Sequence, residues 1–143
     1  MISEHLAIAL RDAGLRWDPT PGDRFVIPQP ELAGQVFTLS EMTIEARQYP
    51  TGTILGFNGT TEWALDSVAK DEALWLPRED QLRERLGGTF VALRREETDG
   101  ASVFVVSTRG PEGPAEFTAA SAADAYAEAL LALIRLVVAD VPA

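Results

Sequence analysis

The sequence has no cysteine, and it has a single lysine, Lys70, and a single histidine, His5. Without cysteine, disulfide bonds, thiolate zinc sites and cysteine nucleophiles are excluded. A serine–histidine–aspartate triad would have to use His5, which falls on the solvent side of the first predicted helix. A metal site would have to consist of carboxylates alone, and the acidic pairs fall in connectors or beside turns. We therefore predict no catalytic residues, no metal and no cofactor.

Several sequence motifs and long apolar runs are also missing. There is no phosphate-binding loop, no Gly-x-Gly-x-x-Gly, no Gly-x-Ser-x-Gly and no His-Glu-x-x-His. The most apolar stretch, Ala129 to Val138, is interrupted by Arg135 and is shorter than the ~20 residues that a membrane span needs. The first residues lack the pattern of a signal peptide. We expect a cytoplasmic protein that does not bind membranes.

Basic residues are few, and the formal net charge is −10. The eleven arginines are spread along the chain, with close pairs only at Arg83/Arg85 and Arg94/Arg95. Nucleic-acid binding normally needs a concentrated basic face. We therefore expect no nucleic-acid partner.

What is present fits one globular domain over residues 1–143. Ser3 is expected to cap a first helix that ends at Gly14. Pro77 is expected at the first position of a short helix ending at Leu86, and residues Asp71 to Leu76 are expected to form a connector. Ser121 is expected to cap a long helix, Ala122 to Ala139.

Short β-prone runs occupy most of the remaining chain. The predicted strands are Phe25–Ile27, Val36–Leu39, Met42–Tyr49, Thr53–Phe57, Phe90–Arg95, Ser102–Ser107 and Ala115–Thr118. Tight turns join consecutive runs, and one of them, Thr98-Asp99-Gly100, joins Phe90–Arg95 to Ser102–Ser107 in a hairpin. The pattern therefore predicts an α+β fold. We expect one antiparallel, meander-like sheet of about six to eight strands. The first and last helices would pack on this sheet, with the short helix in the mid-chain crossover.

Residues Thr60 to Ser67 have two interpretations. Asn58-Gly59 is typical of a tight hairpin turn, which favours a strand with Thr61, Trp63 and Leu65 on one face. The alternative is a helix capped by Thr60 or Thr61.

The candidate binding residues are aromatic and arginine side chains of the middle of the chain. They are Arg47, Tyr49, Trp63, Trp75 and Arg78. Aromatic residues beside arginines are typical of interaction hot spots, although tryptophans in a domain of this size also form the core. We predict that Trp75, with Leu76, Leu82 and Leu86, has a structural role first.

The final helix carries more apolar side chains than one sheet face readily covers. The surplus residues are Leu131, Leu136 and Val138. They favour a two-fold homodimer, and the alternative is a sheet that curls around the helix within one chain.

Three segments resemble a group of small uncharacterised actinobacterial proteins. They are Trp75-Leu-Pro-Arg-Glu-Asp-Gln-Leu82, Phe57-Asn-Gly-Thr-Thr-Glu-Trp-Ala-Leu-Asp-Ser-Val68 and the Ala-Asp-Ala-Tyr start of the last helix. The first segment is also similar to phage-type proteins with Trp-Leu-Pro-x-x-Asp-Gln-Leu before a hairpin. Some members of the group bear a pilus-assembly label, which implies an ATPase relative, whereas this chain lacks a phosphate loop. The resemblance implies no activity and no functional residues.

Two functions follow from these observations. The first is a non-catalytic interaction or adaptor protein that self-associates. The alternative is a small-ligand binder or enzyme whose cleft is lined by the aromatic and arginine residues named above.

Overall fold

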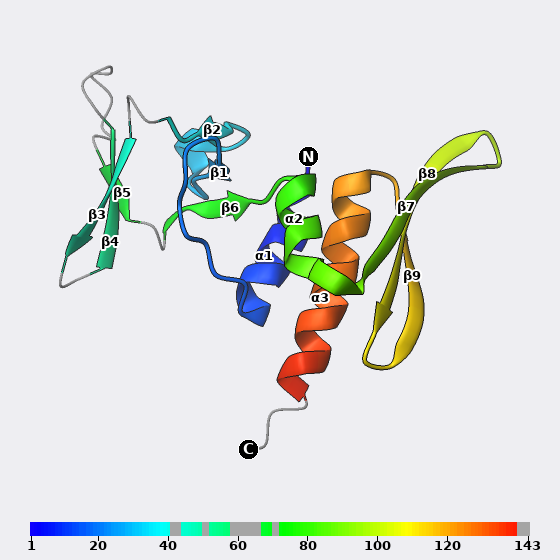
Figure 1. The fold of residues 1–143 in the computed structure, drawn as a ribbon. Coiled ribbons are helices and arrows are strands. Elements are labelled where there is room, and N and C mark those ends of the chain that lie inside the picture. The colour runs from blue at the N-terminus through cyan, green and yellow to red at the C-terminus, as the bar shows by residue number, and fades with distance from the viewer. Residues whose placement is uncertain (41–43, 50–51, 58–66, 70–71, 140–143) are drawn as a thin grey trace. The chain divides into compact units, whose positions relative to one another are not determined.

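The computed structural model describes residues 1–40, 44–49, 52–57, 67–69 and 72–139 (Figure 1), and it describes side chains for residues 1–40 and 72–138. The fold is α+β, as predicted. The chain divides into two compact units. Unit 1 comprises Met1–Arg16 and Pro77–Ala143, and unit 2 is Trp17–Leu76. The organisation of residues 1–143 as a single domain stays a prediction.

Three helices form the helical part of unit 1: α1 (Glu4–Ala13), α2 (Glu79–Leu86) and α3 (Ala122–Ala139). Helices α1 and α2 pack against α3, which in turn packs against two strands of a sheet (Figure 1). In the part of the chain that is described, no helix is both long enough and apolar enough to span a membrane.

The end of α1 follows the predicted stop at Gly14. This residue has a φ of 114°, which only glycine adopts readily. Its N–H donates to the Arg11 carbonyl (3.0 Å), and the Leu15 N–H donates to the Leu10 carbonyl (2.9 Å). These two bonds make a Schellman motif, in which the residue after the glycine closes the helix end.

The start of α1 differs from the prediction. Ser3 occupies the N-cap position, but its hydroxyl makes no capping hydrogen bond. Instead its backbone N–H donates to Asp124 Oδ1 at the start of α3 (2.8 Å). The N-terminus of α1 is thus held by a residue 121 positions away.

Helix α2 begins two residues later than predicted. Pro77 precedes the helix, and Arg78 is the N-cap residue, whose N–H donates to Gln81 Oε1 (2.9 Å). The predicted inward pair is confirmed, because Leu82 and Leu86 are both buried. A short 3₁₀ turn, η3 (Gly87–Thr89), follows.

Strands β7 (Phe90–Thr98), β8 (Ala101–Gly110) and β9 (Gly113–Ala119) form the antiparallel sheet of unit 1, in the order β7-β8-β9. The predicted turn between β7 and β8 is confirmed: Asp99 (φ 52°) and Gly100 (φ 78°) are its two central residues. Positive φ at both positions is the requirement of a type I′ hairpin.

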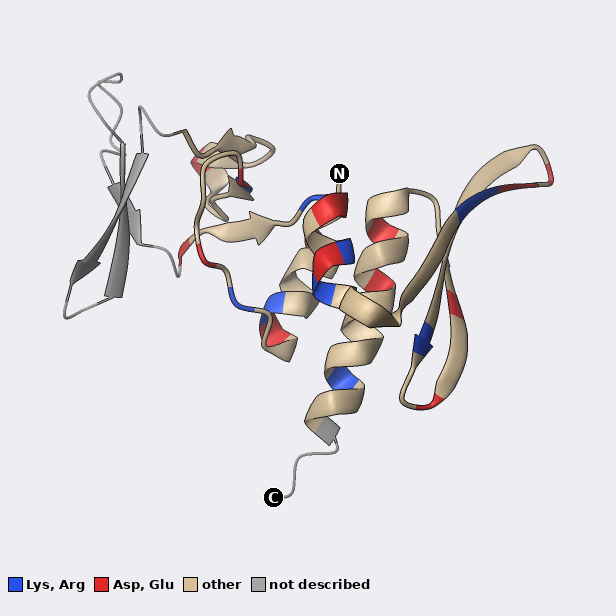
Figure 2. Cartoon of the chain, in the orientation of Figure 1, with Lys and Arg blue, Asp and Glu red and all other residues tan. Residues whose placement is uncertain are grey.

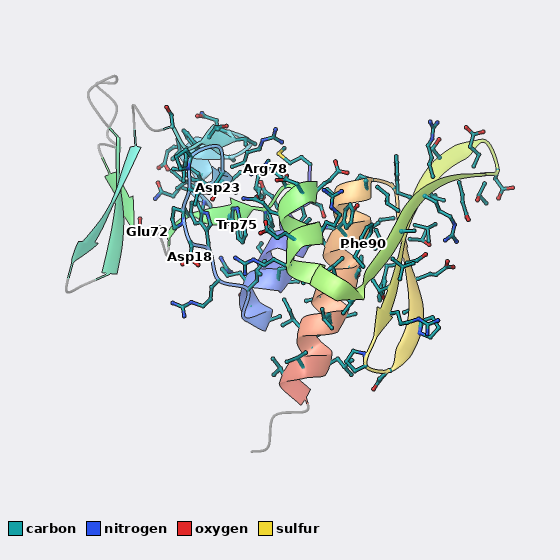
Figure 3. The ribbon with its side chains drawn as sticks, viewed as in Figure 1. Asp18, Asp23, Glu72, Trp75, Arg78 and Phe90 are labelled. Atoms are coloured by element: carbon teal, nitrogen blue, oxygen red, sulfur yellow. The ribbon has the colours of Figure 1, made fainter. Side chains whose placement is uncertain are left out.

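Helix α3 covers one face of this sheet with the bounds that were predicted. Tyr126 and Leu130 of α3 are buried, and the Tyr126 ring lies 5.7 Å from the ring of Phe90. Figure 3 labels Phe90 at the start of β7. The predicted cap is also present, since Ser121 Oγ accepts from the Asp124 N–H (3.2 Å).

In unit 2, strands β1 (Arg24–Val26), β2 (Phe37–Thr38) and β6 (Leu74–Leu76) form a sheet in the order β2-β1-β6. A 3₁₀ turn, η1 (Pro30–Leu32), lies between β1 and β2. The interpretation of Asp71 to Leu76 as a connector is wrong for its last three residues, which are a buried strand. Their partner is β1, some fifty residues earlier, so no nearby turn marks them as a strand.

A second sheet of unit 2 consists of β3 (Ile44–Tyr49), β4 (Gly52–Phe57) and β5 (Ser67–Ala69), in that order and antiparallel. This confirms the predicted β3–β4 hairpin. The choice between strand and helix for Thr60 to Ser67 falls outside the described residues, except for Ser67 at the start of β5.

The prediction of a single sheet of six to eight strands is wrong. The strands of the described ranges form three separate antiparallel sheets of three strands each. In addition, α1 packs on helix α3, whereas the prediction placed it on the sheet. Turn signals identify neighbouring pairs such as β7–β8, but they do not show where a meander is interrupted.

Candidate functional site

Trp75, the predicted hot-spot residue of unit 2, is part of an aromatic core. Its ring stacks on Trp17 with a centroid distance of 6.3 Å and an interplanar angle of 9°. Phe25, directly opposite Trp75 in the sheet, lies 5.6 Å from Trp17. All three side chains are buried. The predicted structural role of Trp75 therefore agrees with its surroundings.

The other candidate binding residues are placed less fully. Trp63 lies outside the described residues, and Arg47 and Tyr49 are described only as backbone in β3. Arg78, in unit 1, is half-exposed at the N-cap of α2, with its Nε 3.2 Å from Asp80 Oδ1. The predicted aromatic and arginine cleft therefore stays a prediction.

Sequence reasoning missed Asp23, a buried carboxylate of unit 2 (Figure 3). Its Oδ2 accepts from Trp17 Nε1 (2.9 Å) and from the Thr20 N–H (3.0 Å), and its Oδ1 accepts from Thr20 Oγ1 (3.1 Å). The Leu39 N–H donates to its backbone carbonyl (2.8 Å). The available signal was the Thr-Pro-Gly-Asp sequence, because aspartate in such turns commonly accepts from nearby backbone N–H groups. Asp23 holds the loop before β1 in place.

The three predicted interface residues of α3 lie in different surroundings. Leu131 is only 5% exposed, so it belongs to the core of unit 1, whereas Val138 is 58% exposed. Leu136 is half-buried. The apolar surface that α3 leaves uncovered is therefore at its C-terminal end, where Val137 is also exposed.

Val138 lines a groove between α1 and α3, which we call the α1/α3 groove. The groove encloses about 650 Å³ and is lined by His5, Ile8, Ala9, Asp12, Ala13, Arg135 and Val138. Its apolar centre includes Ile8, which is 39% exposed. Asp12 comes from α1 and Arg135 from α3, so each helix brings one charge of opposite sign. His5 is exposed, as predicted.

A second concavity, the α3/β9 pocket, lies between α3 and the β8–β9 hairpin. Its volume is about 160 Å³. Apolar side chains such as Phe117, Leu133 and Leu136 form most of the wall, and Thr108 adds a hydroxyl. No residue is shared with the α1/α3 groove.

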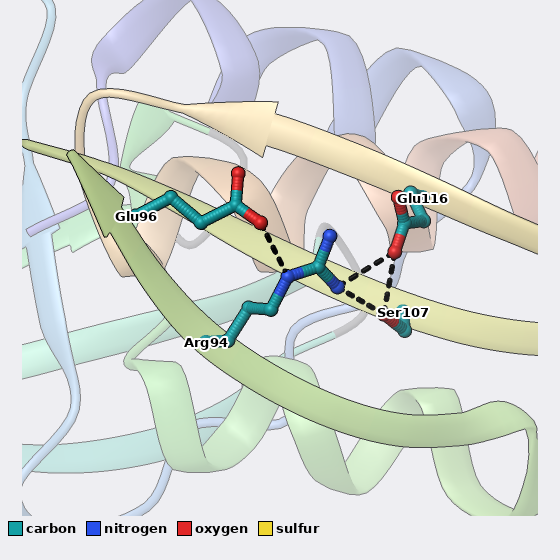
Figure 4. A network of polar contacts seen from close by, with 4 residues as sticks. All are labelled: Arg94, Glu96, Ser107 and Glu116. Atoms are coloured by element: carbon teal, nitrogen blue, oxygen red, sulfur yellow. Dashed lines mark hydrogen bonds and ion pairs between the residues drawn. The ribbon is translucent and has the colours of Figure 1, made fainter. Parts of the chain in front are cut away.

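Arg94 lies at the centre of a polar network on the β7–β9 sheet (Figure 4). Its Nε bonds Glu96 Oε1 (2.7 Å), and its Nη1 bonds Glu116 Oε2 (2.6 Å) and Ser107 Oγ (3.1 Å). The hydrogen bond from Arg94 lowers the pKa of Glu116, and the same bond raises the pKa of Arg94. The network joins all three strands, because Arg94 and Glu96 lie on β7, Ser107 on β8 and Glu116 on β9. All these groups are exposed or half-exposed, so each bond contributes little to stability.

The described arginines are spread over several helices and strands (Figure 2). Arginines occur on α1, α2, β7, β8 and α3, and acidic residues lie beside most of them. Among the described residues, no group of three or more histidine, aspartate or glutamate side chains is placed to hold a metal ion.

Comparison of the chain with protein-family models, with curated proteins and with solved structures gives no match. The resemblance to small actinobacterial and phage-type proteins stays a prediction.

Proposed function

We propose that this protein is a non-catalytic interaction protein that associates with a second copy of itself through the α1/α3 groove. The observation that carries the proposal is the exposed apolar surface of this groove, formed by Ile8 and Val138. Soluble proteins seldom leave contiguous apolar surface uncovered unless it is an interaction site.

The charges of the groove favour a second copy over an unrelated partner. In a two-fold interface every contact occurs twice. If residue i of one copy contacts residue j of the partner, then residue j of the first copy contacts residue i of the partner. Asp12 and Arg135 line the same groove from opposite helices, so one two-fold contact would form two Asp12–Arg135 pairs around an apolar centre. Within the described residues Arg135 makes no ion pair, and Asp12 pairs only with Arg11, at the surface (3.2 Å).

This proposal retains Val138 from the interface that the sequence suggested. Leu131 is excluded as a contact because the chain itself buries it, and Leu136 lines the other concavity. A chain without cysteine and with a net charge of −10 suits the cytoplasm and association with protein better than with nucleic acid.

Light scattering over a dilution series tests the association. We expect a mass of twice 15.5 kDa at micromolar concentration, and the single-chain mass for Ile8→Glu and Val138→Glu. The matched control is Val91→Glu, because Val91 is 60% exposed on β7, away from the groove. A mass of 15.5 kDa at every concentration would refute the proposal.

A charge exchange tests the two-fold geometry. Asp12→Arg and Arg135→Asp should each weaken the dimer, because each places like charges opposite one another. The double variant restores opposite charges and should recover most of the association. If the double variant associates more weakly than either single variant, the two residues do not face each other.

A further inference from the structure

The α3/β9 pocket is hollow because small residues line it where larger ones would fill it. Thr108 and Ala115 are directly opposite in the β8–β9 ladder, so both face α3. On α3, Ala129 and Ala132 are spaced so that they share the face that carries Leu133 and Leu136. Alanine side chains on both walls leave the space between them open, and Phe117 is also part of the wall.

Thr89, Thr108 and Glu112 are the polar side chains of the lining, and Thr108 is the buried one. The residue is 8% exposed, and it lines the pocket. A hydroxyl on the wall of a pocket can both donate to and accept from a molecule bound there. A bound molecule with one donor or acceptor would hydrogen-bond to this hydroxyl.

The volume and charge of the pocket limit what it accepts. An engineered apolar cavity of about 150 Å³ binds one benzene molecule, so a pocket of about 160 Å³ has room for one six-membered ring. Glu112 lies on the wall, and the chain is acidic, which disfavours an anion. Water in such a pocket finds few polar partners and is displaced favourably by an apolar group.

We infer that the α3/β9 pocket binds a neutral aromatic alcohol the size of phenol. The ring would lie between Phe117 and the α3 leucines, Leu133 and Leu136, and its hydroxyl would hydrogen-bond Thr108. This site is independent of the proposed dimer, because the two concavities share no residue.

The test is a ¹H–¹⁵N NMR titration of the full chain with phenol and, separately, with benzene. We expect saturable shifts centred on residues of the pocket, with phenol binding more tightly than benzene. Thr108→Val keeps the shape of the side chain and removes the hydroxyl. It should weaken phenol binding about two- to tenfold and leave benzene unchanged or slightly tighter.

Two further variants make the result specific. Thr118→Val is the matched control: Thr118 is exposed on β9, and its register partner is Val105, so it lies on the opposite sheet face from Thr108. It should change neither affinity. Ala132→Phe, at an exposed position on the wall, should fill the pocket and abolish binding of both probes.

Absence of saturable shifts with both probes would overturn the inference. So would phenol binding that survives Ala132→Phe, or an equal loss of phenol and benzene affinity in Thr108→Val. If either probe changes the mass in light scattering but shifts no pocket residue, the ligand site belongs to the dimer interface instead.

Discussion

Replacement of Asp23 should destabilise unit 2 by an amount that depends on which hydrogen bonds the new residue keeps. The carboxylate is 1% exposed and accepts from Trp17 Nε1 in a fully buried bond. Its two bonds from Thr20 are half-buried, so water can replace them in part. A buried donor left without a partner costs about 1–3 kcal/mol, and each partly exposed bond contributes about 0.5–1 kcal/mol. We therefore expect Asp23→Ala to lower the free energy of unfolding by about 2–5 kcal/mol.

Asp23→Asn should cost much less. The amide oxygen can take the place of Oδ2 and accept from both Trp17 Nε1 and the Thr20 N–H. The amide nitrogen can then donate to Thr20 Oγ1, because a hydroxyl also accepts. These three bonds lose only the strengthening by charge, so we expect a decrease of about 1 kcal/mol.

Urea unfolding followed by far-UV circular dichroism measures both losses, and amide hydrogen exchange in β1 and β6 assigns them to unit 2. A double-mutant cycle with Trp17→Phe isolates the buried bond. Asp23→Ala should cost about 1–2 kcal/mol less in the Trp17→Phe background. The reasoning is refuted if Asp23→Asn is as damaging as Asp23→Ala, or if Asp23→Ala costs less than about 1 kcal/mol.

Two other predictions concern polar groups of unit 1. Ser3→Ala should leave the free energy of unfolding unchanged or slightly higher, because the buried Ser3 hydroxyl has no partner. The matched control, Ser121→Ala, removes a capping bond and should lower the free energy of unfolding by about 1 kcal/mol. Equal losses for the two variants in urea unfolding would contradict this prediction. Glu116→Gln should lower the thermal midpoint slightly at neutral pH. The folded-state pKa of Glu116 is below its ordinary value of 4.5, so its contribution is present above that value and is lost as the pH falls through the lowered pKa. The exposed Glu128→Gln serves as control, and a Glu116→Gln difference that persists in strong acid would exclude the ion pair as its cause.

Elements whose determinants are close in sequence were predictable. Helix α3 was expected at its observed bounds because its cap, Ser121, and its helix-forming residues are contiguous. The β7–β8 turn was expected because Asp99-Gly100 tolerates positive φ at both positions. The end of α1 at Gly14 has the same local origin. In each case the backbone preference of a few neighbouring residues determines the structure.

The candidate sites were predictable only in part. Val138 was identified from the apolar pattern of α3, but Ile8, Asp12 and Thr108 were not. An apolar pattern shows that a helix has more than one buried face, and it cannot show which residues the same chain covers. Leu131 illustrates this, because it is buried where α1, α2 and the β8–β9 strands surround α3.

Local chemistry in the sequence by itself determined the α+β class, the helix ends with glycine or serine signals, and the hairpins with two-residue turns. Only the tertiary structure decided that β6 pairs with β1, that Asp124 receives the Ser3 N–H, and that Asp23 accepts from Trp17. These contacts join residues whose own preferences leave several partners open. The choice among partners depends on which arrangement buries apolar side chains and satisfies polar groups over the whole unit.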